Sequence, residues 1–370
     1  MNPPIRILHV LSAMDMAGTE TLIMSFYRQV NRLEIQFDFA VSATKECAYD
    51  KEILSMGGLI FHYPRYKVTN HFAYKQWWEK FLSEHQEYKI IHGHIGSTAA
   101  IYLSVAKKYN RIAIAHSHST KGENNLHGLL YRLWSYPTRY IADYFFGCSK
   151  QALTDRYGKK VSDNSKIASV LNNAINASSF IFDSEVRKEI RGEYNIGNEE
   201  FVLGTVGRLA PPKNPLFTIE ILKELNNRGV NFKMLWFGKG PMEVNIKNKL
   251  KEYDLTDRVI LAGNRPDVNR VLQAMDIFLF PSVWEGLGIA CVEAQASGLV
   301  TICSNTIPIE AKITKYCYYL PIDDAKCWAD YCVYNKNYER ENCYEAIQKA
   351  GFDIVKLASH LSQFYLNIKH

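Results

Sequence analysis

Long apolar runs, paired cysteines and internal repeats are all missing from this chain of 370 residues. No stretch approaches the ~20 uninterrupted apolar residues of a membrane-spanning helix, and the opening segment lacks the basic and then apolar regions of a secretory signal. The eight cysteines include no C-x-x-C pair and stand mostly in apolar runs, so we expect reduced, buried thiols in a cytoplasmic protein. The lack of a fixed-period repeat excludes solenoids and propellers.

The composition is that of an ordinary globular protein. Hydrophobic residues make up 47% of the chain and charged residues 22%, which excludes wholesale disorder. The net charge of +6 is compatible with anionic substrates, a lipid surface or nucleic acid, and does not choose among them. The length favours two domains of about 150–200 residues each.

Short apolar runs alternate with amphipathic helical patterns in both halves of the chain, which predicts two parallel, doubly wound α/β domains. In the first half the predicted strands cover residues 5–11, 37–41, 58–62, 90–94, 111–116 and 144–148, with helices at 21–30 and 99–108. In the second half they cover residues 201–206, 232–237, 259–261, 277–280 and 300–304, with helices at 216–227, 242–253, 268–275 and 289–297.

Residues 172–197 are polar and rich in turn formers, and we place the interdomain linker at 176–185. The predicted domains are therefore 1–178 and 179–350, followed by a final segment, 351–370. Apolar residues at helical spacing in this segment predict an amphipathic helix over 351–366.

Ligands of doubly wound sheets bind beyond the carboxyl ends of the strands, so three loops after strands are candidates for a site. The first loop, 14–20, contains Gly18, which lets backbone approach a ligand, and precedes a helix N-terminus that favours an anion. It is not a G-x-G-x-x-G loop, so a nicotinamide cofactor is disfavoured. The alternative is a simple turn in which Glu20 complements the helix dipole.

The second loop, 207–215, follows an apolar strand and carries two cations, Arg208 and Lys213. A guanidinium fork and an ammonium group placed together suit the oxygens of a diphosphate. The alternative is a pair of solvated surface cations.

The third loop, 281–293, contains Gly286 and Gly288 just before a predicted helix whose amides would meet phosphate oxygens. Glu285 projects from the loop and Glu293 lies about one turn inside the helix, so both carboxylates can accept hydrogen bonds from sugar hydroxyls. A glycosidase acid and nucleophile pair would need both at one bond, and two separate anchors fit the spacing better. A helix-terminal charge and an exposed helical residue are the alternatives without function.

Two H-x-H pairs, His92 with His94 and His116 with His118, each close a strand-like run. Alternate strand residues share a face, so either pair could bind zinc or lie near a ligand, although no nearby carboxylate completes a metal shell. A hydrogen-bonded structural histidine is the alternative for each.

Aromatic and basic residues interleave in segments 63–67, 77–81 and 129–134. Such faces could dock on an anionic membrane, or they are packed helices with snorkelling cations. No nucleic-acid-binding module accompanies them, and we expect no nucleic acid partner.

These loops, in this order, resemble glycosyltransferase family 4, a family of retaining enzymes with the GT-B fold. Ala17–Glu20 is similar to the family's Gly-Gly-x-Glu loop, residues 170–176 to its Asn-Gly-Ile-Asp signature, Gly207–Lys213 to its Gly-Arg-Leu…Lys loop, and Glu285…Glu293 to its Glu-x7-Glu motif. The resemblance covers nearly the whole chain. It departs from the family at Ala17, which replaces a glycine, and at Ala174 and Asn176 in the linker signature.

The resemblance implies a role for each of these residues. Gly18, Arg208 and Lys213 would bind the donor diphosphate, Glu285 the donor sugar and Glu293 the ribose. His118 would line the reaction centre, with His116 as the other candidate. The implied catalytic set is His118, Glu285, Arg208 and Lys213, and the implied nucleotide-sugar set is Gly18, Glu20, Gly207, Arg208, Lys213, Gly263, Asn264, Arg265, Glu285, Gly286, Leu287, Gly288, Ile289 and Glu293.

The predicted architecture is a GT-B fold: two Rossmann-like domains face each other across a cleft, and a C-terminal helix crosses back to the N-terminal, acceptor-binding domain. We expect a retaining hexosyltransferase that needs no metal or cofactor. Its donor would be a UDP-sugar and its acceptor a saccharide or lipid-linked saccharide of capsule or exopolysaccharide synthesis, at the inner face of the plasma membrane. A UDP-sugar epimerase of the same architecture, an H-x-H zinc hydrolase and a pure binding protein are the alternatives.

Overall fold

The chain divides into two compact units in the computed structural model, which describes residues 3–118 and 133–368. The N-terminal unit comprises Met1–Ala174 and Ile354–His370, and the C-terminal unit comprises Ile175–Asp353. These boundaries differ by a few residues from those predicted at 178 and 350. Ile175 and Asp353 pair as an isolated parallel bridge, which places both residues in the C-terminal unit.

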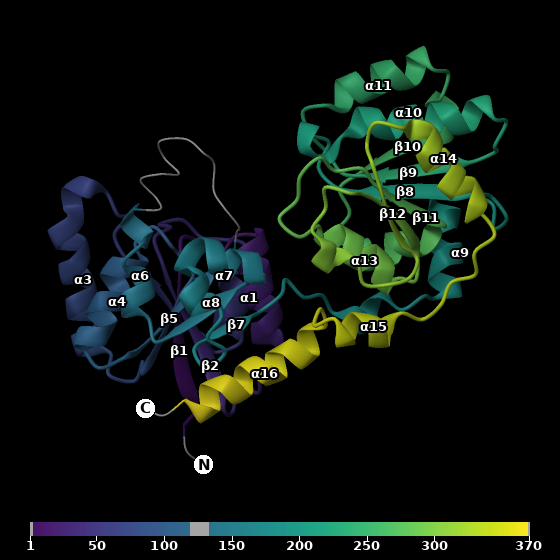
Figure 1. The fold of residues 1–370 in the computed structure, drawn as a ribbon. Coiled ribbons are helices and arrows are strands. Elements are labelled where there is room, and N and C mark those ends of the chain that lie inside the picture. The colour runs from purple at the N-terminus through teal and green to yellow at the C-terminus, as the bar shows by residue number, and fades with distance from the viewer. Residues whose placement is uncertain (1–2, 119–132, 369–370) are drawn as a thin grey trace. The chain divides into compact units, whose positions relative to one another are not determined.

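The described residues of the N-terminal unit contain a seven-stranded parallel sheet in the order β3-β2-β1-β4-β5-β6-β7 (Figure 1). In its register, Ile7 of β1 lies between Phe37 of β2 and Ile90 of β4. Strand β2 is buried along its whole length, as expected for a parallel sheet covered on both faces. The strands are β1 (Ile5–Leu11), β2 (Ile35–Val41), β3 (Ile60–His62), β4 (Ile90–Gly93), β5 (Ile112–Ser117), β6 (Tyr144–Gly147) and β7 (Ala168–Val170).

Helices cover both faces of this sheet. One buried cluster joins the sheet to α1, α2 and α16, and another joins its opposite face to α3, α4 and α7. The helices are α1 (Gly18–Gln29), α2 (Asp50–Ser55), α3 (His71–Glu84), α4 (Ala99–Lys108), α6 (Thr138–Ile141), α7 (Lys150–Tyr157), α8 (Lys159–Ser162) and α16 (Ile354–Asn367), with a 3-10 turn η1 (Val68–Asn70).

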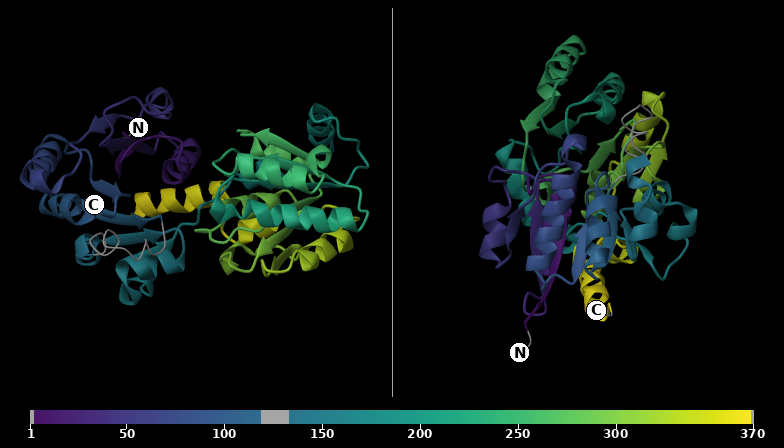
Figure 2. Two further views of the ribbon diagram at one scale, coloured as in Figure 1. Left: turned by 90° about the horizontal axis from the view of Figure 1, so that it is seen from above. Right: turned by 90° about the vertical axis from the view of Figure 1, so that its left-hand side faces the viewer.

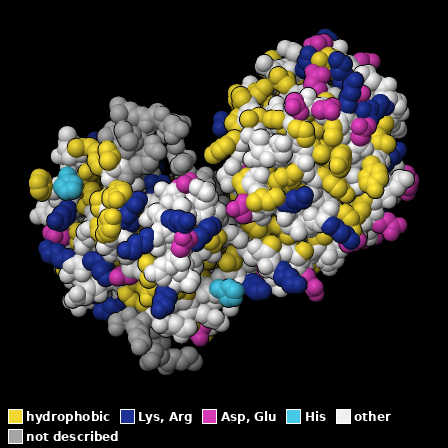
Figure 3. Space-filling model, in the orientation of Figure 1, with side chains coloured by type: hydrophobic (Ala, Val, Ile, Leu, Met, Phe, Trp, Pro, Cys, Tyr) yellow, Lys and Arg dark blue, Asp and Glu magenta, His cyan; other side chains and the backbone are white. Residues whose placement is uncertain are grey.

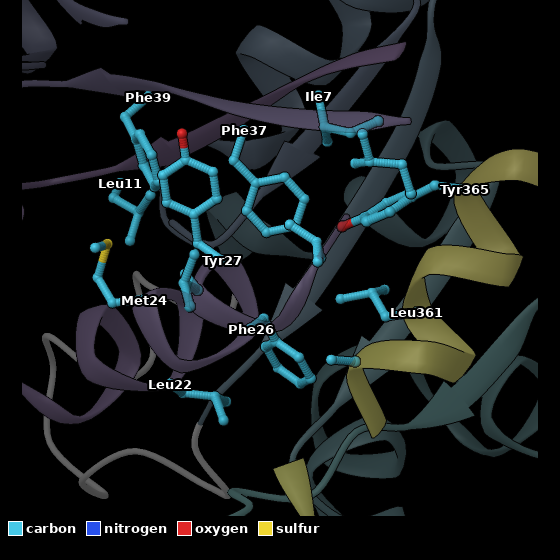
Figure 4. Packing of buried hydrophobic residues seen from close by; sticks show 14 of the residues in the cluster. Ile7, Leu11, Leu22, Met24, Phe26, Tyr27, Phe37, Phe39, Leu361 and Tyr365 are labelled. Atoms are coloured by element: carbon cyan, nitrogen blue, oxygen red, sulfur yellow. The ribbon is translucent and has the colours of Figure 1, made fainter. Parts of the chain in front are cut away.

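Helix α16 lies where the sequence predicts a final helix and completes the core of the N-terminal unit (Figure 4). Tyr365 is fully buried and meets the edge of Phe37 at a ring-centroid distance of 6.0 Å. Tyr27 of α1 stacks on Phe37 from the other side, at 5.4 Å. Leu361, which is 3% exposed, belongs to the same cluster. The chain's last helix is therefore an integral part of the first unit's core.

In the C-terminal unit the described residues form a six-stranded parallel sheet in the order β10-β9-β8-β11-β12-β13. Helices α10, α11 and α14 cover one face, and α9 and α13 cover the other (Figure 2). The strands are β8 (Val202–Val206), β9 (Lys233–Phe237), β10 (Val259–Gly263), β11 (Ile277–Phe280), β12 (Val300–Ser304) and β13 (Cys317–Leu320).

The helices of this unit are α9 (Ser184–Glu193), α10 (Pro215–Asn227), α11 (Glu243–Glu252), α12 (Val268–Val271), α13 (Ile289–Ala296), α14 (Ala325–Tyr334) and α15 (Tyr344–Lys349). The 3-10 turns are η2 (Ala177–Phe180), η3 (Pro211–Lys213), η4 (Thr256–Arg258), η5 (Leu272–Ala274) and η6 (Ile309–Ala311). None of the described helices of the chain is both long and apolar enough to cross a membrane.

The segment 172–197, which the sequence indicates to be polar and turn-rich, contains a helix, α9, which begins at Ser184 at the end of the predicted linker, 176–185. This corrects the turn-rich interpretation of the segment. Asp183 caps it by accepting hydrogen bonds from the amides of Glu185 and Val186. Its buried face consists of Ile190 and Arg191, and Arg191 donates to the Asp276 carboxylate at 2.9 Å. The helix docks through a buried guanidinium rather than an apolar stripe, so hydrophobic periodicity did not reveal it.

Candidate active site

Three successive loops of the C-terminal unit are joined by backbone hydrogen bonds where β8, β9 and β10 end. The Gly207 amide donates to the Phe237 carbonyl at 2.9 Å, and the Gly238 amide donates to the Gly263 carbonyl at 2.8 Å. Gly238 has a φ of 140°, and a Cβ there would lie 1.9 Å from the Gly207 carbonyl oxygen. Only glycine allows the loops to approach this closely. The loops thus form a rigid floor built largely from backbone.

A pocket of about 400 Å³ opens above these loops. Arg208 and Lys239 are exposed at its rim, and neither side chain forms a hydrogen bond or an ion pair with any residue the structure describes. The pocket therefore offers two cations with free donors, as an anionic ligand requires. Its lining residues are Val206, Gly207, Arg208, Phe237, Gly238, Lys239, Asn264 and Arg265.

Arg265 is held differently from the other two cations. Its guanidinium binds both carboxylate oxygens of Asp267 at 2.8 Å and one oxygen of Glu193 at 2.6 Å. Hydrogen bonds to these two carboxylates raise the pKa of Arg265. The side chain is thus fixed in place and its charge is compensated, which suits a contact of defined geometry better than a contact to phosphate.

The two loops that carry Lys213 and Glu285 meet on the same side of this unit. The Lys213 ammonium binds the Glu285 carboxylate at 2.5 Å and lies 5.1 Å from the centre of the Phe280 ring. The Val283 amide donates to the Pro212 carbonyl at 2.8 Å and ties the loops together. The two side chains are 29% and 14% exposed. The sequence predicts separate roles for them, and the structure brings them into one ion pair.

Helix α13 begins at Ile289 after Gly288, which adopts a left-handed conformation with a φ of 85°. No side chain in the described part of the chain caps the first turn, so its amides are available to a ligand. Gly286 is exposed, and no atom of the described residues lies within 4 Å of where its Cβ would be. Leu287 is 8% exposed and packs in the core, so only its backbone can face a ligand.

Glu293 lies in the second turn of α13 and is partly buried. Burial raises the pKa of its carboxyl to about 7. The group therefore changes charge near neutral pH, which an exposed helical glutamate would not do. Perturbed carboxyl groups of this kind concentrate at functional sites.

The two remaining nucleotide-site candidates, Gly18 and Glu20, belong to the N-terminal unit. Gly18 opens α1 after Ala17. Among the residues that the structure describes, no side chain caps this end and no atom lies within 4 Å of where a Gly18 Cβ would be. Burial and the nearby Asp15 carboxylate raise the pKa of Glu20, while its own backbone hydrogen bond opposes the shift. The loop presents open backbone amides beside a carboxyl group whose ionisation is disfavoured.

The structure brings the four predicted histidines together and adds a fifth, His9 of β1. His9 Nδ1 lies 2.9 Å from His94 Nε2, and His94 Nδ1 lies 2.8 Å from His118 Nε2. His92 bonds to the Tyr365 hydroxyl at 2.6 Å, whereas both ring nitrogens of His116 are buried without a hydrogen-bond partner in the described chain. The sequence indicated each histidine pair separately. That the two pairs lie together depends on the alignment of adjacent strands, which the sequence does not show.

Burial keeps these rings neutral. It lowers the pKa of His9 to about 3 and that of His118 to about 4. Burial, reinforced by the neighbouring rings, also lowers the pKa of His92, His94 and His116 well below the ordinary value.

Three sets of side chains among the described residues have ligand atoms close enough to hold a metal ion. Two consist of imidazoles and share His94, and no carboxylate joins either set. The third consists of buried thiols of the C-terminal unit, where Cys291 Sγ lies 3.2 Å from Cys303 Sγ. The eight cysteines are free thiols, and all except the partly buried Cys327 are buried. The three sets are His9, His92 and His94; His94, His116 and His118; and Cys291, Cys303 and Cys317.

Some aromatic side chains of the aromatic and basic segments are packed in the core, and others are exposed. Trp78 and Phe81 of α3 are buried in the core, whereas Phe72 on the same helix is 86% exposed. Hydrophobic and basic side chains lie side by side on the face of the N-terminal unit shown in Figure 3. A pocket of about 330 Å³ in this unit is lined by Tyr66, Val68, His71, Ser97, Ile101 and Trp134. Of the predicted segment 129–134, residues 129–132 lie outside the described residues.

Sequence reasoning missed Lys239 and His9. Lys239 stands between Gly238 and Gly240 directly after an apolar strand, the same signal that marked the loop at Gly207. His9 lies within a strand, and its significance depends on the register that sets it beside His92.

Comparison with known proteins identifies the class of enzyme. Residues 186–316, within the C-terminal unit, match the family model described as glycosyl transferases group 1. EpsF of Bacillus subtilis (strain 168), named provisionally as a glycosyltransferase, is 28% identical over 309 residues, 82% of this chain and 79% of its own length. The UDP-Gal:alpha-D-GlcNAc-diphosphoundecaprenol alpha-1,3-galactosyltransferase of Escherichia coli is 35% identical over 143 residues, 37% of this chain and 36% of that protein. Other relatives are named for capsular polysaccharide and colanic acid biosynthesis.

Solved structures share the fold. HepE of Anabaena in complex with UDP superposes with a TM-score of 0.79 at 14% identity, covering 98% of this chain and 100% of that one. The predicted architecture of two Rossmann-like domains of the GT-B type is confirmed. So is the predicted class of enzyme: the chain is a glycosyltransferase.

Proposed function

We propose that this glycosyltransferase, as a family 4 enzyme, transfers a hexose from a UDP-sugar to a lipid-linked or free saccharide of capsule or exopolysaccharide synthesis. Transfer retains the anomeric configuration and requires no metal ion. The names of its relatives support the donor and the acceptor class, since one uses UDP-galactose and a diphosphoundecaprenol-linked sugar. UDP-bound HepE, of the same fold, supports the choice of nucleotide.

The observation that carries the proposal is the pocket at the ends of β8, β9 and β10, with Arg208 and Lys239 at its rim, neither of them paired with a described residue. These side chains would bind the diphosphate, and the first turn of α13 would add backbone amides. Asn264 and Arg265 would contact the nucleobase from the same pocket. Glu293 would accept hydrogen bonds from the ribose hydroxyls once it is ionised.

The ion pair between Lys213 and Glu285 couples binding of the nucleotide to binding of the donor sugar. A diphosphate competes with Glu285 for the Lys213 ammonium, because both are anions that accept charge-assisted hydrogen bonds. Once Lys213 turns to the diphosphate, the Glu285 carboxylate is released to accept bonds from the donor sugar. Binding of the nucleotide thus prepares the recognition of the sugar.

The bond between the anomeric carbon and the diphosphate oxygen breaks in the reaction, and the acceptor oxygen bonds to the same face of that carbon. The acceptor proton passes to the departing diphosphate. Negative charge grows on the diphosphate as the bond breaks, and Arg208 and Lys213 stabilise it more in the transition state than in the bound donor. These cations supply what a metal ion supplies in other transferases.

The N-terminal unit would bind the acceptor, and Gly18, Glu20 and His118 are the site residues proposed for this unit. The exposed aromatic and basic side chains of this unit suit an acceptor held at the inner face of the plasma membrane.

A panel of nucleotides and nucleotide sugars, scanned by thermal shift, tests the donor, because a ligand of the native state raises Tm in proportion to its affinity. We expect UDP and a UDP-hexose to raise Tm more than GDP or ADP. Transfer to an undecaprenyl diphosphate saccharide, followed by NMR of the new linkage, tests the stereochemistry. An inverted product, an epimerised donor formed without acceptor, or a strict need for added manganese would each overturn the proposal.

A further inference from the structure

Another pocket of the N-terminal unit lies where the order of the strands reverses. Strand β1 is flanked by β2 on one side and by β4 on the other, so the chain proceeds outward from β1 in both directions. Doubly wound sheets bind ligands at such a point, in the crevice beyond the carboxyl ends of the strands. The pocket has a volume of about 240 Å³, and the loops that follow β1, β2, β3 and β4 line it. We name it the switch-point pocket.

Hydroxyl groups line this pocket. Ser12 and Ser42 follow β1 and β2 directly, and Ser97 lies in the loop after β4. The Ser42 hydroxyl donates to the Ser12 carbonyl at 3.1 Å, whereas the hydroxyls of Ser12 and Ser97 form no hydrogen bond with a described residue. Ser12 is exposed and Ser97 is half-buried, so a ligand can reach both. Each free hydroxyl can donate one hydrogen bond and accept others, as the hydroxyls of a sugar require.

Arg65 brings a positive charge to the same pocket, and none of the described residues that line it is a carboxylate. The Arg65 side chain is exposed and forms no hydrogen bond or ion pair with any residue the structure describes. By contrast, the guanidinium groups of Arg6 and Arg28 in the same unit each bind both oxygens of a carboxylate. An anionic ligand would therefore bind Arg65 without displacing an internal partner.

The backbone that carries Arg65 is held on both sides. The Tyr63 hydroxyl donates to the Leu11 carbonyl at 2.7 Å. The side-chain amide of Asn70 donates to the Arg65 carbonyl at 3.0 Å. Between these contacts, the ring of Pro64 restricts φ. The loop is thus fixed beside the pocket, while the guanidinium remains available to a ligand.

We propose that the switch-point pocket binds one sugar unit of the acceptor, and that Arg65 selects a unit that carries an anionic group. The serine hydroxyls would bind the sugar hydroxyls, and the guanidinium would bind carboxylate or phosphate oxygens in a bidentate manner. The volume is slightly below the range of about 300–1,000 Å³ that is typical of small-molecule pockets, which suits a single sugar unit. This inference rests on the proposed role of the N-terminal unit in acceptor binding. The anionic group is either the carboxylate of a uronic acid or the phosphate at the reducing end of a lipid-linked saccharide.

The adjacent pocket of about 330 Å³ extends the site, because it shares Tyr66 and Ser97 with the switch-point pocket. None of the described residues that line it is a lysine, an arginine or an acid. Tyr66 and Trp134 meet edge to face there at a centroid distance of 6.5 Å, and Val68 is 63% exposed. These side chains suit an uncharged part of the acceptor. Together the two pockets would recognise an anionic sugar unit next to an uncharged group.

The binding of glucose, glucuronic acid and glucose 1-phosphate tests the proposal. Ligand-observed NMR measures each Kd with the full chain and saturating UDP, which keeps glucose 1-phosphate out of the donor pocket. We expect at least one of the two anionic sugars to bind about tenfold more tightly than glucose. A preference for glucuronic acid would identify the anionic group as a carboxylate, and a preference for glucose 1-phosphate would identify it as a phosphate. If neither anionic sugar binds more tightly than glucose, the proposal is overturned.

Two variants locate the preference. Arg65→Ala should remove it, whereas Lys67→Ala should keep it, because Lys67 is an exposed cation of the same segment that lines neither pocket. Both substitutions fall on exposed side chains, so Tm should not change. A preference that survives in Arg65→Ala, or one that both variants lose equally, would overturn the proposal.

These measurements need no transfer of a sugar, so they separate this inference from the proposed function. If Arg65→Ala loses the preference but the wild type transfers no hexose from a UDP-sugar, the proposed function fails and the inference stands. If the wild type transfers a hexose and Arg65→Ala has an unchanged KM for an acceptor with an anionic unit, the inference fails and the proposed function stands.

Discussion

Replacing Glu285 by glutamine separates the two functions of the ion pair with Lys213. The side chains are 29% and 14% exposed, so solvent weakens the pair but does not abolish it. We assign the pair an interaction free energy of about 1 kcal/mol. A diphosphate must offset this free energy to bind Lys213. Removal of the pair should leave the affinity for UDP unchanged or raise it up to about fivefold, since 1.4 kcal/mol corresponds to a factor of ten.

The same substitution should damage recognition of the sugar. The neutral amide of glutamine makes weaker hydrogen bonds to sugar hydroxyls than a carboxylate does. In the variant, UDP-glucose should therefore no longer bind more tightly than UDP. Turnover should fall about 100-fold, because the lost contacts also position the anomeric carbon.

Titration calorimetry with UDP and then UDP-glucose measures both effects. Glu243→Gln, which breaks the exposed pair with Lys247 on α11, is the matched control and should change neither affinity. A tenfold loss of UDP affinity in Glu285→Gln would refute the reasoning, because it would make Glu285 part of the nucleotide site itself.

Three further outcomes are expected. Arg208→Ala should lower turnover 100-fold or more with an unchanged Tm, because the side chain is exposed and stabilises only developing charge; near wild-type steady-state rates would remove Arg208 from the diphosphate site. UDP affinity should rise roughly tenfold between pH 6 and 8, since the Glu293 pKa of about 7 must be passed before the carboxylate can accept bonds from ribose. In Glu293→Gln, only the rise in UDP affinity that comes from ionisation of the UDP phosphate itself should remain. An equal rise in the wild type and in Glu293→Gln would refute the assignment. Transfer should persist after dialysis against EDTA, and elemental analysis showing stoichiometric zinc together with lost activity would favour a metal enzyme.

Apolar runs predicted most of the fold. Strands β11 and β12 and helix α4 have the predicted bounds, because a strand covered on both faces is mostly apolar and α4 has a regular buried stripe. Helix α9 was missed since its docking depends on Arg191 and Asp276, which no periodicity reveals. The local sequence pattern therefore predicts elements that pack through apolar side chains, but not an element that packs through a buried ion pair.

Site residues were predictable one loop at a time, and their contacts were not. Glycines and cations after strands identified Gly207, Arg208 and Lys213. That Lys213 meets Glu285 depends on the neighbouring positions of β8 and β11 in the sheet, which sequence spacing does not contain. The protonation of Glu293 likewise depends on burial within the unit.

Helix α16 determines the order in which the two units can fold during synthesis. The core of the N-terminal unit lacks Leu361 and Tyr365 until helix α16 has been translated, whereas the C-terminal unit is continuous and can close first. During synthesis Phe37 and its neighbours remain uncovered while the whole second unit is made, and they are an expected binding site for chaperones. A fragment that ends at Ala174 should expose the same apolar face permanently and aggregate.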